Sequence, residues 1–289
     1  MLAHFIINTL IVGSTYALVA MAFRLMFSVS PFFNFTLGAI ATAASYLMFY
    51  LSRQLGAPLW FSVPSVLVFS GLFAWALEAF AYRPMANRGA SSMILLVASL
   101  GIYTIFEAVI HLMFGPQYQT LGSISESSAI KVLDIDIPLI QALSIMCSFT
   151  IFAFLDYFLH HTFIGKQIRA VNDSANLSYI LGMKTDRIIM IVSIMAGVIL
   201  GLTGILVGYD TGMEPTMGFN LLFKGIIGAI IGGMAGIWGA FFGAIFLAFS
   251  ENLGVWLFAS EWRDLVAFVI FITFLYFKPH GIFQKKVKN

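Results

Sequence analysis

Residues 188–208 read IIMIVSIMAGVILGLTGILVG, a run of 21 residues without one charged side chain. A helix needs about 20 mostly apolar residues to cross a bilayer, so this run predicts a membrane span. Similar apolar runs, separated by polar or glycine- and proline-rich breaks, occupy the rest of the chain. We place the spans near 5–23, 37–51, 60–82, 92–114, 139–160, 188–208, 221–235, 238–258 and 264–278. The sequence therefore predicts an all-α polytopic membrane protein with about eight or nine transmembrane helices.

The composition excludes several classes of protein. Of the 289 residues, 60% are hydrophobic and 10% are charged, against roughly 25% charged residues in soluble domains. We therefore exclude a soluble enzyme and predict a single transmembrane domain over 1–289. The net charge of +2 does not indicate a nucleic-acid partner, and the single Cys147 excludes an internal disulfide. There is no G-x-x-x-x-G-K-[ST] loop for nucleotide phosphates, so ATP hydrolysis would have to reside in another chain.

The basic residues predict which side of the membrane each loop occupies, since cytoplasmic loops are enriched in Lys and Arg. We expect the cytoplasmic side to carry Arg24, Arg83, Arg88, Lys166, Arg169, Lys184, Arg187, Lys278, Lys285, Lys286 and Lys288. The other side carries Arg53, Lys131, Lys224 and Arg263. This bias predicts an N-terminus outside and a C-terminus in the cytoplasm.

Three connecting segments are candidates for contacts with partner proteins, because long loops are often functional. Two of them, 115–138 and 209–223, are expected outside. The third, 161–187, is expected in the cytoplasm and contains a short helix that Asp173 or Ser174 caps and Gly182 ends. Leu177, Ile180 and Leu181 fall on one face of this helix. Such an apolar face either docks into a groove of a partner or rests on lipid headgroups or on the protein itself.

Glycines recur every three or four residues in the seventh and eighth spans, at Gly225, Gly228, Gly232, Gly236, Gly239 and Gly243. The segment 232–236 predicts that these two spans form a hairpin or a broken element. Small residues on one stripe let helices approach closely. The stripe is either an interface for sliding or dimerisation, or tight packing within one subunit.

Polar groups inside the spans are functional candidates. Asn34 follows Pro31 at a helix break, where it either meets a substrate or holds the break by a structural hydrogen bond. Glu78, and Glu107 with His111 four residues later, either belong to a pathway or form structural pairs. Glu251 with Asn252 favours a structural interpretation. The spacing of Asp156, His160 and His161 is compatible with metal binding, but no third ligand is near in the sequence, so we predict no metal site.

Several motifs in order give the chain a resemblance to a known family. The opening has Gly13-Ser14, Tyr16-Ala17-Leu18 and Asn34-Phe35, followed later by Tyr82-Arg83-Pro84 and Phe114-Gly115-Pro116. Further on come Pro215-Thr216-Met217-Gly218, Lys224, Gly232-Gly233 through Gly239-Ala240, and Lys278-Pro279-His280-Gly281-Ile282-Phe283. Along nearly its whole length the chain resembles the permeases of bacterial ABC importers of branched-chain amino acids. It departs from the family pattern at Thr36-Leu37 and at Asn176-Leu177-Ser178.

The resemblance implies a permease subunit of the bacterial inner membrane with no catalytic residue and no cofactor of its own. It implies two ATP-binding subunits that hold ATP and magnesium, a second and homologous permease subunit, and an extracytoplasmic substrate-binding protein. The substrate would be a branched-chain or other hydrophobic amino acid, with urea or a short amide as the alternative. The implied pathway residues are Asn8, Ser14, Tyr16, Asn34, Thr36 and Gly38, and the implied residues for coupling to the ATPase are Arg169, Asp173, Leu177, Leu181, Gly182 and Lys184.

Three other functions stay open on the residues alone. An ion-driven secondary carrier would transport without an ATPase. A membrane-embedded enzyme would use Asp156, His160 and His161, and a non-transporting scaffold would need none of these groups.

Overall fold

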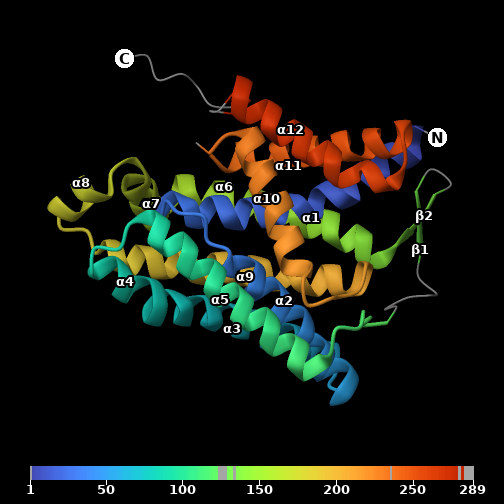
Figure 1. Ribbon diagram of the computed structural model, residues 1–289, viewed down its shortest axis with the longest axis horizontal. Coiled ribbons are helices and arrows are strands. Elements are labelled where there is room, and N and C mark those ends of the chain that lie inside the picture. Colours follow the sequence, from blue (N-terminus) through green and yellow to red (C-terminus); the bar gives the residue numbers. More distant parts are fainter. Residues whose placement is uncertain (1, 123–128, 133–134, 235, 279–280, 283–289) are drawn as a thin grey trace. The chain divides into compact units, whose positions relative to one another are not determined.

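The computed structural model describes residues 2–122, 129–132, 135–234, 236–278 and 281–282. Their elements, labelled in Figure 1, are almost all helical. The α-helices are α1 (Leu2–Val29), α2 (Thr36–Phe49), α3 (Leu59–Leu77), α4 (Arg83–Asn87), α5 (Ser92–Phe114), α6 (Leu139–His161), α7 (Phe163–Asp173), α8 (Ala175–Ile180), α9 (Thr185–Asp210), α10 (Met217–Gly232), α11 (Ile237–Leu257) and α12 (Arg263–Phe277). Two π-helical turns, Tyr50–Gln54 and Glu78–Tyr82, follow α2 and α3, and a 3-10 turn, Ser260–Trp262, precedes α12.

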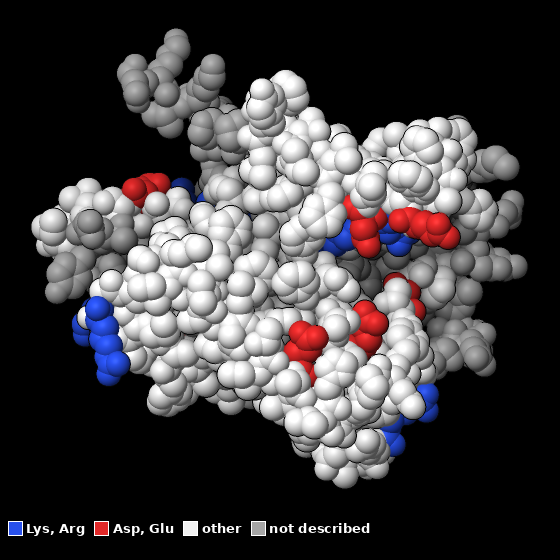
Figure 2. All heavy atoms as spheres, viewed as in Figure 1, with Lys and Arg blue, Asp and Glu red and all other residues white. Residues whose placement is uncertain are grey.

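The prediction of an all-α membrane protein is confirmed, whereas the count of eight or nine spans stays a prediction. Within the described residues, six helices are long and apolar enough to cross a membrane: His4–Val29, Leu59–Asn87, Ser92–Phe114, Leu139–His161, Thr185–Asp210 and Ile237–Leu257. The other three predicted spans are helices too, but α2, α10 and α12 have 14, 16 and 15 residues. Uncharged residues form most of the surface visible in Figure 2, as the composition predicts.

A short hairpin interrupts the helical pattern inside the predicted external loop 115–138. Strands β1 (Ala129–Val132) and β2 (Ile135–Pro138) pair antiparallel, with Ala129 opposite Pro138 and Val132 opposite Ile135. From the sequence we predicted only a long connecting loop here and no strand. The missed signal is the alternation of Ile130, Val132, Ile135 and Ile137, which has the two-residue period of a strand.

The chain divides into two compact units that interleave along the sequence. The first unit comprises Met1–Arg24, Ile124–Asp156 and Phe223–Asn289, and the second comprises Leu25–Ser123 and Tyr157–Leu222. A single domain over 1–289 stays a prediction.

In the second unit, α9 packs against both α2 and α3 (Figure 1). Small residues allow this approach, because Gly204 lies against the backbone of Ala41 and Gly197 lies against Ser70 and Ala74. At one end of this unit the connections after α5 and α9 pair: Gln119 and Met213 exchange two backbone hydrogen bonds of 2.9 and 2.8 Å. Arg53 donates from Nε to the carbonyl of Leu121 at that same end, over 2.7 Å. The predicted external segments 115–138 and 209–223 therefore meet.

In the first unit, α10 and α11 form a tight hairpin. Gly228 faces Ala244, and Gly232 faces Gly239 and Gly243. The break falls after Gly232, and Gly233 has a positive φ of 100°, a conformation that favours glycine. Ile282 donates its backbone N–H to the carbonyl of Ile231 over 2.9 Å, so the segment after α12 returns to the end of α10. The predicted hairpin between spans seven and eight is confirmed.

Candidate functional site

A row of polar side chains lies among the apolar helices of the first unit, and all of them except the exposed Asn8 are buried. It comprises Asn8, Thr9 and Tyr16 on α1, Lys224 on α10, and Glu251 and Asn252 on α11, and we call these six residues the polar seam. Ionisable groups in a membrane span are costly unless they pair. The seam therefore needs a complete set of partners within the unit.

An ion pair forms the centre of the polar seam. Lys224 Nζ lies 2.5 Å from Oε1 of Glu251, and the hydroxyl of Tyr16 donates to Oε2 of Glu251 over 2.9 Å. Glu251 is fully buried, and both of its carboxylate oxygens have a donor. Lys224 also lies 2.8 Å from Oδ1 of Asp264, whose side chain is 78% exposed. The lysine thus joins a buried acid on α11 to an exposed acid on α12.

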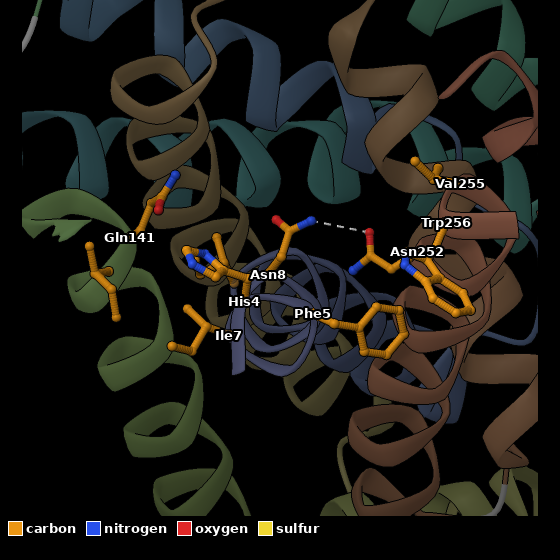
Figure 3. Close-up of a pocket in the computed structure, with 10 residues that line it drawn as sticks. His4, Phe5, Ile7, Asn8, Gln141, Asn252, Val255 and Trp256 are labelled. Carbon is orange, nitrogen blue, oxygen red and sulfur yellow. Dashed lines mark hydrogen bonds between the residues drawn. The ribbon is translucent and has the colours of Figure 1, made fainter. Parts of the chain in front are cut away.

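An asparagine pair continues the polar seam toward the first turns of α1. Asn252 is buried and donates from Nδ2 to the hydroxyl of Thr9 over 3.1 Å. Asn8 donates from Nδ2 to Oδ1 of Asn252 over 3.4 Å, and Figure 3 shows the two amides facing each other across a pocket. The structure thus joins two predicted pathway residues, Asn8 and Tyr16, to one seam through partners on α11.

Two predictions about basic residues were wrong. Lys224 was assigned to the outer end of the predicted span 221–235, but it lies in the middle of α10, where it is buried and forms an ion pair with Glu251. Arg24 was assigned to a cytoplasmic helix end, but α1 continues to Val29 and leaves Arg24 only 5% exposed. A single charge in an apolar run was read as a span end. Without these two residues the predicted bias is still ten basic residues against three.

Ser14 does not join the polar seam. Its hydroxyl donates to the carbonyl of Ile11 over 2.7 Å, within its own helix. Its predicted pathway role has no supporting contact with the seam and stays a prediction.

A second polar cluster lies at the break between α1 and α2, in the second unit. Oδ1 of Asn34 accepts from the backbone N–H of Thr36 over 3.1 Å, from its hydroxyl over 2.6 Å, and from the hydroxyl of Tyr82 over 3.1 Å. The hydroxyl of Ser99 accepts from the N–H of Phe35 over 3.1 Å. These bonds satisfy backbone donors that the first turn of a helix leaves free. Asn34 therefore has the geometry of a structural cap for α2, and its pathway role stays a prediction.

Tyr82 and Ser99 are members of this cluster that the sequence did not reveal. Ser99 lies in an uninterrupted apolar run, and nothing in its spacing marks it. Tyr82 belongs to a π-helical turn, a feature that is often found at functional sites. The neighbouring Gly38, another predicted pathway residue, packs against the backbone of Gly218, so a side chain there would meet the carbonyl group of Gly218.

The cap predicts a measurable loss of stability. Asn34→Ala should lower the free energy of unfolding by about 1–2 kcal/mol, because it removes a cap and leaves the Thr36 and Tyr82 hydroxyls with fewer acceptors. Ser91→Ala is the control, since Ser91 caps α5 in an exposed position by a 3.4 Å bond. Thermal unfolding of the purified protein measures both. If both variants lost the same free energy of unfolding, the burial of Asn34 would not be the cause of its larger expected effect.

The segment 161–187, which the sequence predicts to be cytoplasmic, contains the helices α7 and α8. Ser174 accepts from the N–H of Leu177 over 3.2 Å, which caps α8. Gly182 has a φ of +79°, and the N–H of Met183 bonds back to the carbonyl of Ser178, which ends the helix. Leu177, Ile180 and Leu181 are 56%, 78% and 67% exposed. The predicted apolar face is thus present and uncovered in this chain.

The remaining predicted coupling residues flank this face. Arg169, Asp173, Gly182 and Lys184 are exposed. Arg83, at the start of α4, forms a 2.6 Å ion pair with Asp186, at the start of α9. This pair ties the end of the segment to the π-helical turn that contains Tyr82.

The other polar candidates form no site of their own. Glu107 and His111 lie 4.0 Å apart and are partly exposed, so they are not a buried pair. Asp156 accepts a 2.8 Å hydrogen bond from the indole N–H of Trp238. Glu78 is buried, and within the described residues its Oε2 has no hydrogen-bond partner. In the same part of the chain no group of three or more His, Cys, Asp or Glu side chains could hold a metal.

The glycines of the predicted stripe divide into two kinds. Five of them, Gly225, Gly228, Gly232, Gly239 and Gly243, contact backbone or side-chain atoms of the first unit closely enough that a Cβ would clash. Gly236 is different, since a Cβ there would meet nothing within 4 Å. The contacts of these five are those of tight packing within one subunit, and a role in dimerisation stays a prediction.

The many long apolar helices and the paired ionisable groups between them define a polytopic membrane protein. Residues 5–275 match the family described as the permease component of the branched-chain amino acid transport system. The chain belongs to this family. Its members act as permeases in transport systems, so the chain is a transport subunit rather than an enzyme.

Named relatives agree with this assignment over almost the whole chain. The high-affinity branched-chain amino acid transport system permease protein BraD of Pseudomonas aeruginosa is 25% identical, over 96% of this chain and 94% of its own length. LivH of Escherichia coli, a permease of the same description, is 26% identical over 95% and 93%. The probable permease LivH of Methanocaldococcus jannaschii is 24% identical over 95% and 90%.

A solved structure shares the fold. The structure titled PsaBC from Streptococcus pneumoniae in complex with Fab aligns with a TM-score of 0.56 over 97% of both chains, at 15% sequence identity. At this identity the likeness shows the fold alone.

Proposed function

We propose that this chain is the membrane permease subunit of an ATP-driven importer of branched-chain or other hydrophobic amino acids in the bacterial inner membrane. The observation that carries the proposal is the family match over residues 5–275, together with relatives named for branched-chain amino acid transport. The uncovered apolar face of α8 supports it, because an ATPase subunit would cover such a face.

The proposed assembly contains two ATP-binding subunits, a second permease subunit and an extracytoplasmic substrate-binding protein. The ATPase subunits would hold ATP and magnesium, and this chain would hold neither. The substrate-binding protein would dock on the end of the second unit where Gln119 and Met213 pair. The ATPase would dock on the opposite end, on α7 and α8.

The proposed topology has eight or nine transmembrane helices, with α2, α10 and α12 as the shorter ones. The N-terminus lies outside and the C-terminus lies in the cytoplasm. The ion pair between Arg83 and Asp186 supports this sidedness, because it joins two helix ends that the basic residues assign to the cytoplasm. Arg53 bonds to Leu121 at the end assigned to the outside.

The second unit offers a contiguous route from the docking face to the break before α2. Movement of α8 would be passed to α4 through the Arg83–Asp186 pair, and α4 directly follows the turn that contains Tyr82. Tyr82 in turn bonds to Asn34 and Thr36 at the start of α2. Closure of the ATPase subunits would thus shift the polar cluster. This shift would switch the pathway from being open to the outside to being open to the cytoplasm.

Uptake by the reconstituted importer tests the function. Proteoliposomes that contain this chain, its partner permease and both ATPase subunits should take up leucine only with ATP and the binding protein. A secondary carrier would instead take up leucine with this chain alone and would be stopped by an ionophore. Uptake of urea or acetamide in place of leucine would move the substrate assignment to the alternative within the family.

Docking on α8 predicts the effect of one added charge. Leu181→Asp should lower ATP-dependent uptake and ATPase co-purification by about tenfold, because it places a carboxylate in an apolar contact. Two variants serve as controls. Leu181→Met keeps the face apolar, and Asn172→Asp adds the same charge on the exposed side of α7. Wild-type uptake and association in Leu181→Asp would show that the docking assignment is wrong.

A further inference from the structure

A pocket of about 750 Å³ opens in the first unit between the first turns of α1 and α6 and the last turns of α11 (Figure 3). The residues that line it are His4, Phe5, Ile7, Asn8, Ile11, Ile137, Gln141, Asn252, Val255 and Trp256. Its volume falls within the range of small-molecule sites in proteins. It lies where the polar seam reaches its asparagine pair.

The lining has the chemistry of a site for a ligand with no net charge. Aliphatic side chains and the rings of Phe5 and Trp256 form most of the wall, and the side-chain amides of Asn8, Gln141 and Asn252 form its polar part. None of the ten lining residues is Asp, Glu, Lys or Arg. A ligand with a net charge would lack a countercharge here. A ligand with an apolar part and a compact, balanced polar part would find both kinds of partner.

The asparagine pair fixes one acceptor at the centre of this pocket. Asn252 is buried, and its amide bonds to Thr9 and Asn8. Because Asn8 donates from Nδ2 to Asn252, the rotation of the Asn8 amide is set. None of the described hydrogen bonds uses the carbonyl oxygen of Asn8. In Figure 3 this oxygen lies on the side that faces Gln141 and His4, away from Asn252.

We propose that this pocket is the acceptor site at which the permease takes over its substrate, and that it binds a zwitterionic α-amino acid with an apolar side chain. The ammonium group donates to the carbonyl oxygen of Asn8, and the carboxylate lies on the side of Gln141. The apolar side chain packs against Ile7, Val255 and Trp256. Asn252 is a positioning residue, since it acts on the ligand only through Asn8. The assignment rests on the proposed function for the direction of transport.

Selectivity is the readout that separates this role from a structural one. Ile7→Ala and Trp256→Ala widen the pocket, so we expect the ratio of phenylalanine uptake to valine uptake to rise by about tenfold. Ile6→Ala and Trp60→Ala are matched controls, because both residues are exposed and neither lines the pocket. The assay uses cells that express the complete importer. Since the binding protein is the same in every strain, a changed ratio reports on the permease.

A second experiment tests the side-chain amide of Asn8. Asn8→Leu should lower the uptake of both amino acids by about tenfold, which is the effect of a lost hydrogen bond to an ammonium group. Asn252→Leu should cause a similar loss, and the double variant should lose no more than either single variant. Asn8→Gln, which keeps an amide, should recover part of the uptake. Additive losses would contradict the positioning role of Asn252.

The outcomes distinguish this proposal from the proposed function. If wild type transports leucine but the uptake ratio is unchanged in Ile7→Ala and Trp256→Ala, the acceptor site is wrong and the function stands. If wild type transports no amino acid, the proposed function itself fails. If the pocket variants lose co-purification with the second permease at an unchanged uptake ratio, the pocket is a subunit interface, which also overturns the acceptor site.

Discussion

Lys224→Met is expected to lower the free energy of unfolding by about 3–5 kcal/mol, the cost of breaking a buried ion pair by removing one partner. The reason is the position of Glu251. This carboxylate is fully buried, and among the described residues it would keep only the hydroxyl of Tyr16 as a donor without Lys224. We expect less protein in the membrane and a lower midpoint of thermal unfolding for the purified variant.

Asp264→Asn is the matched control for this prediction. Asp264 contacts the same lysine at 2.8 Å, but its side chain is 78% exposed. Exposed ion pairs contribute about 0–1 kcal/mol, so this variant should unfold close to wild type. A loss as large as that of Lys224→Met would show that burial is not the source of the effect.

The double variant Lys224→Met/Glu251→Gln separates stability from transport. With both charges removed, most of the lost stability should return, because neutral replacement of a buried pair costs little. If uptake stays low in this stable variant, the ion pair also serves transport. If uptake returns with stability, the pair is structural only.

The long helices were predictable because a bilayer sets a minimum length for an apolar run. The same rule failed at Lys224 and Arg24, which were placed at the ends of spans although both are buried inside helices. Whether such a charge is paired inside the protein depends on residues far away in the sequence. Glu251 is 27 residues from Lys224 and 235 residues from Tyr16, and no local pattern connects them.

The candidate site was predictable only in part for the same reason. Asn8 and Tyr16 were singled out by a resemblance, and Glu251 and Asn252 by their polarity within a span, but only the structure shows that these residues are hydrogen-bond partners. Asn34 was left open between two roles, and three hydrogen bonds to its carbonyl oxygen favour the structural one. The apolar face of α8 could be predicted from the sequence. The cap Ser174, the glycine Gly182 that ends the helix and the apolar side chains between them all lie within one short segment.

Gly243→Ala is expected to lower the free energy of unfolding by about 3 kcal/mol, the upper part of the usual range for overpacking. A Cβ at this position would lie 2.6 Å from the Cα of Gly232, on the backbone of the facing helix. Backbone atoms of a helix cannot move aside as a side chain can, so α10 and α11 would have to separate. This loss must exceed the gain of about 1 kcal/mol that alanine brings to a helix interior.

Gly236 and Gly101 are control positions for this prediction, because a Cβ at either one would meet nothing within 4 Å. Gly236→Ala, at the extended residue before α11, should leave stability unchanged. Gly101→Ala, inside α5, should keep or raise it by up to about 1 kcal/mol through helix propensity alone. Thermal unfolding midpoints of the three variants decide the point. If Gly243→Ala is as stable as Gly101→Ala, the close approach of α10 and α11 does not depend on Gly243. The assignment of this glycine to tight packing within the hairpin would then be wrong.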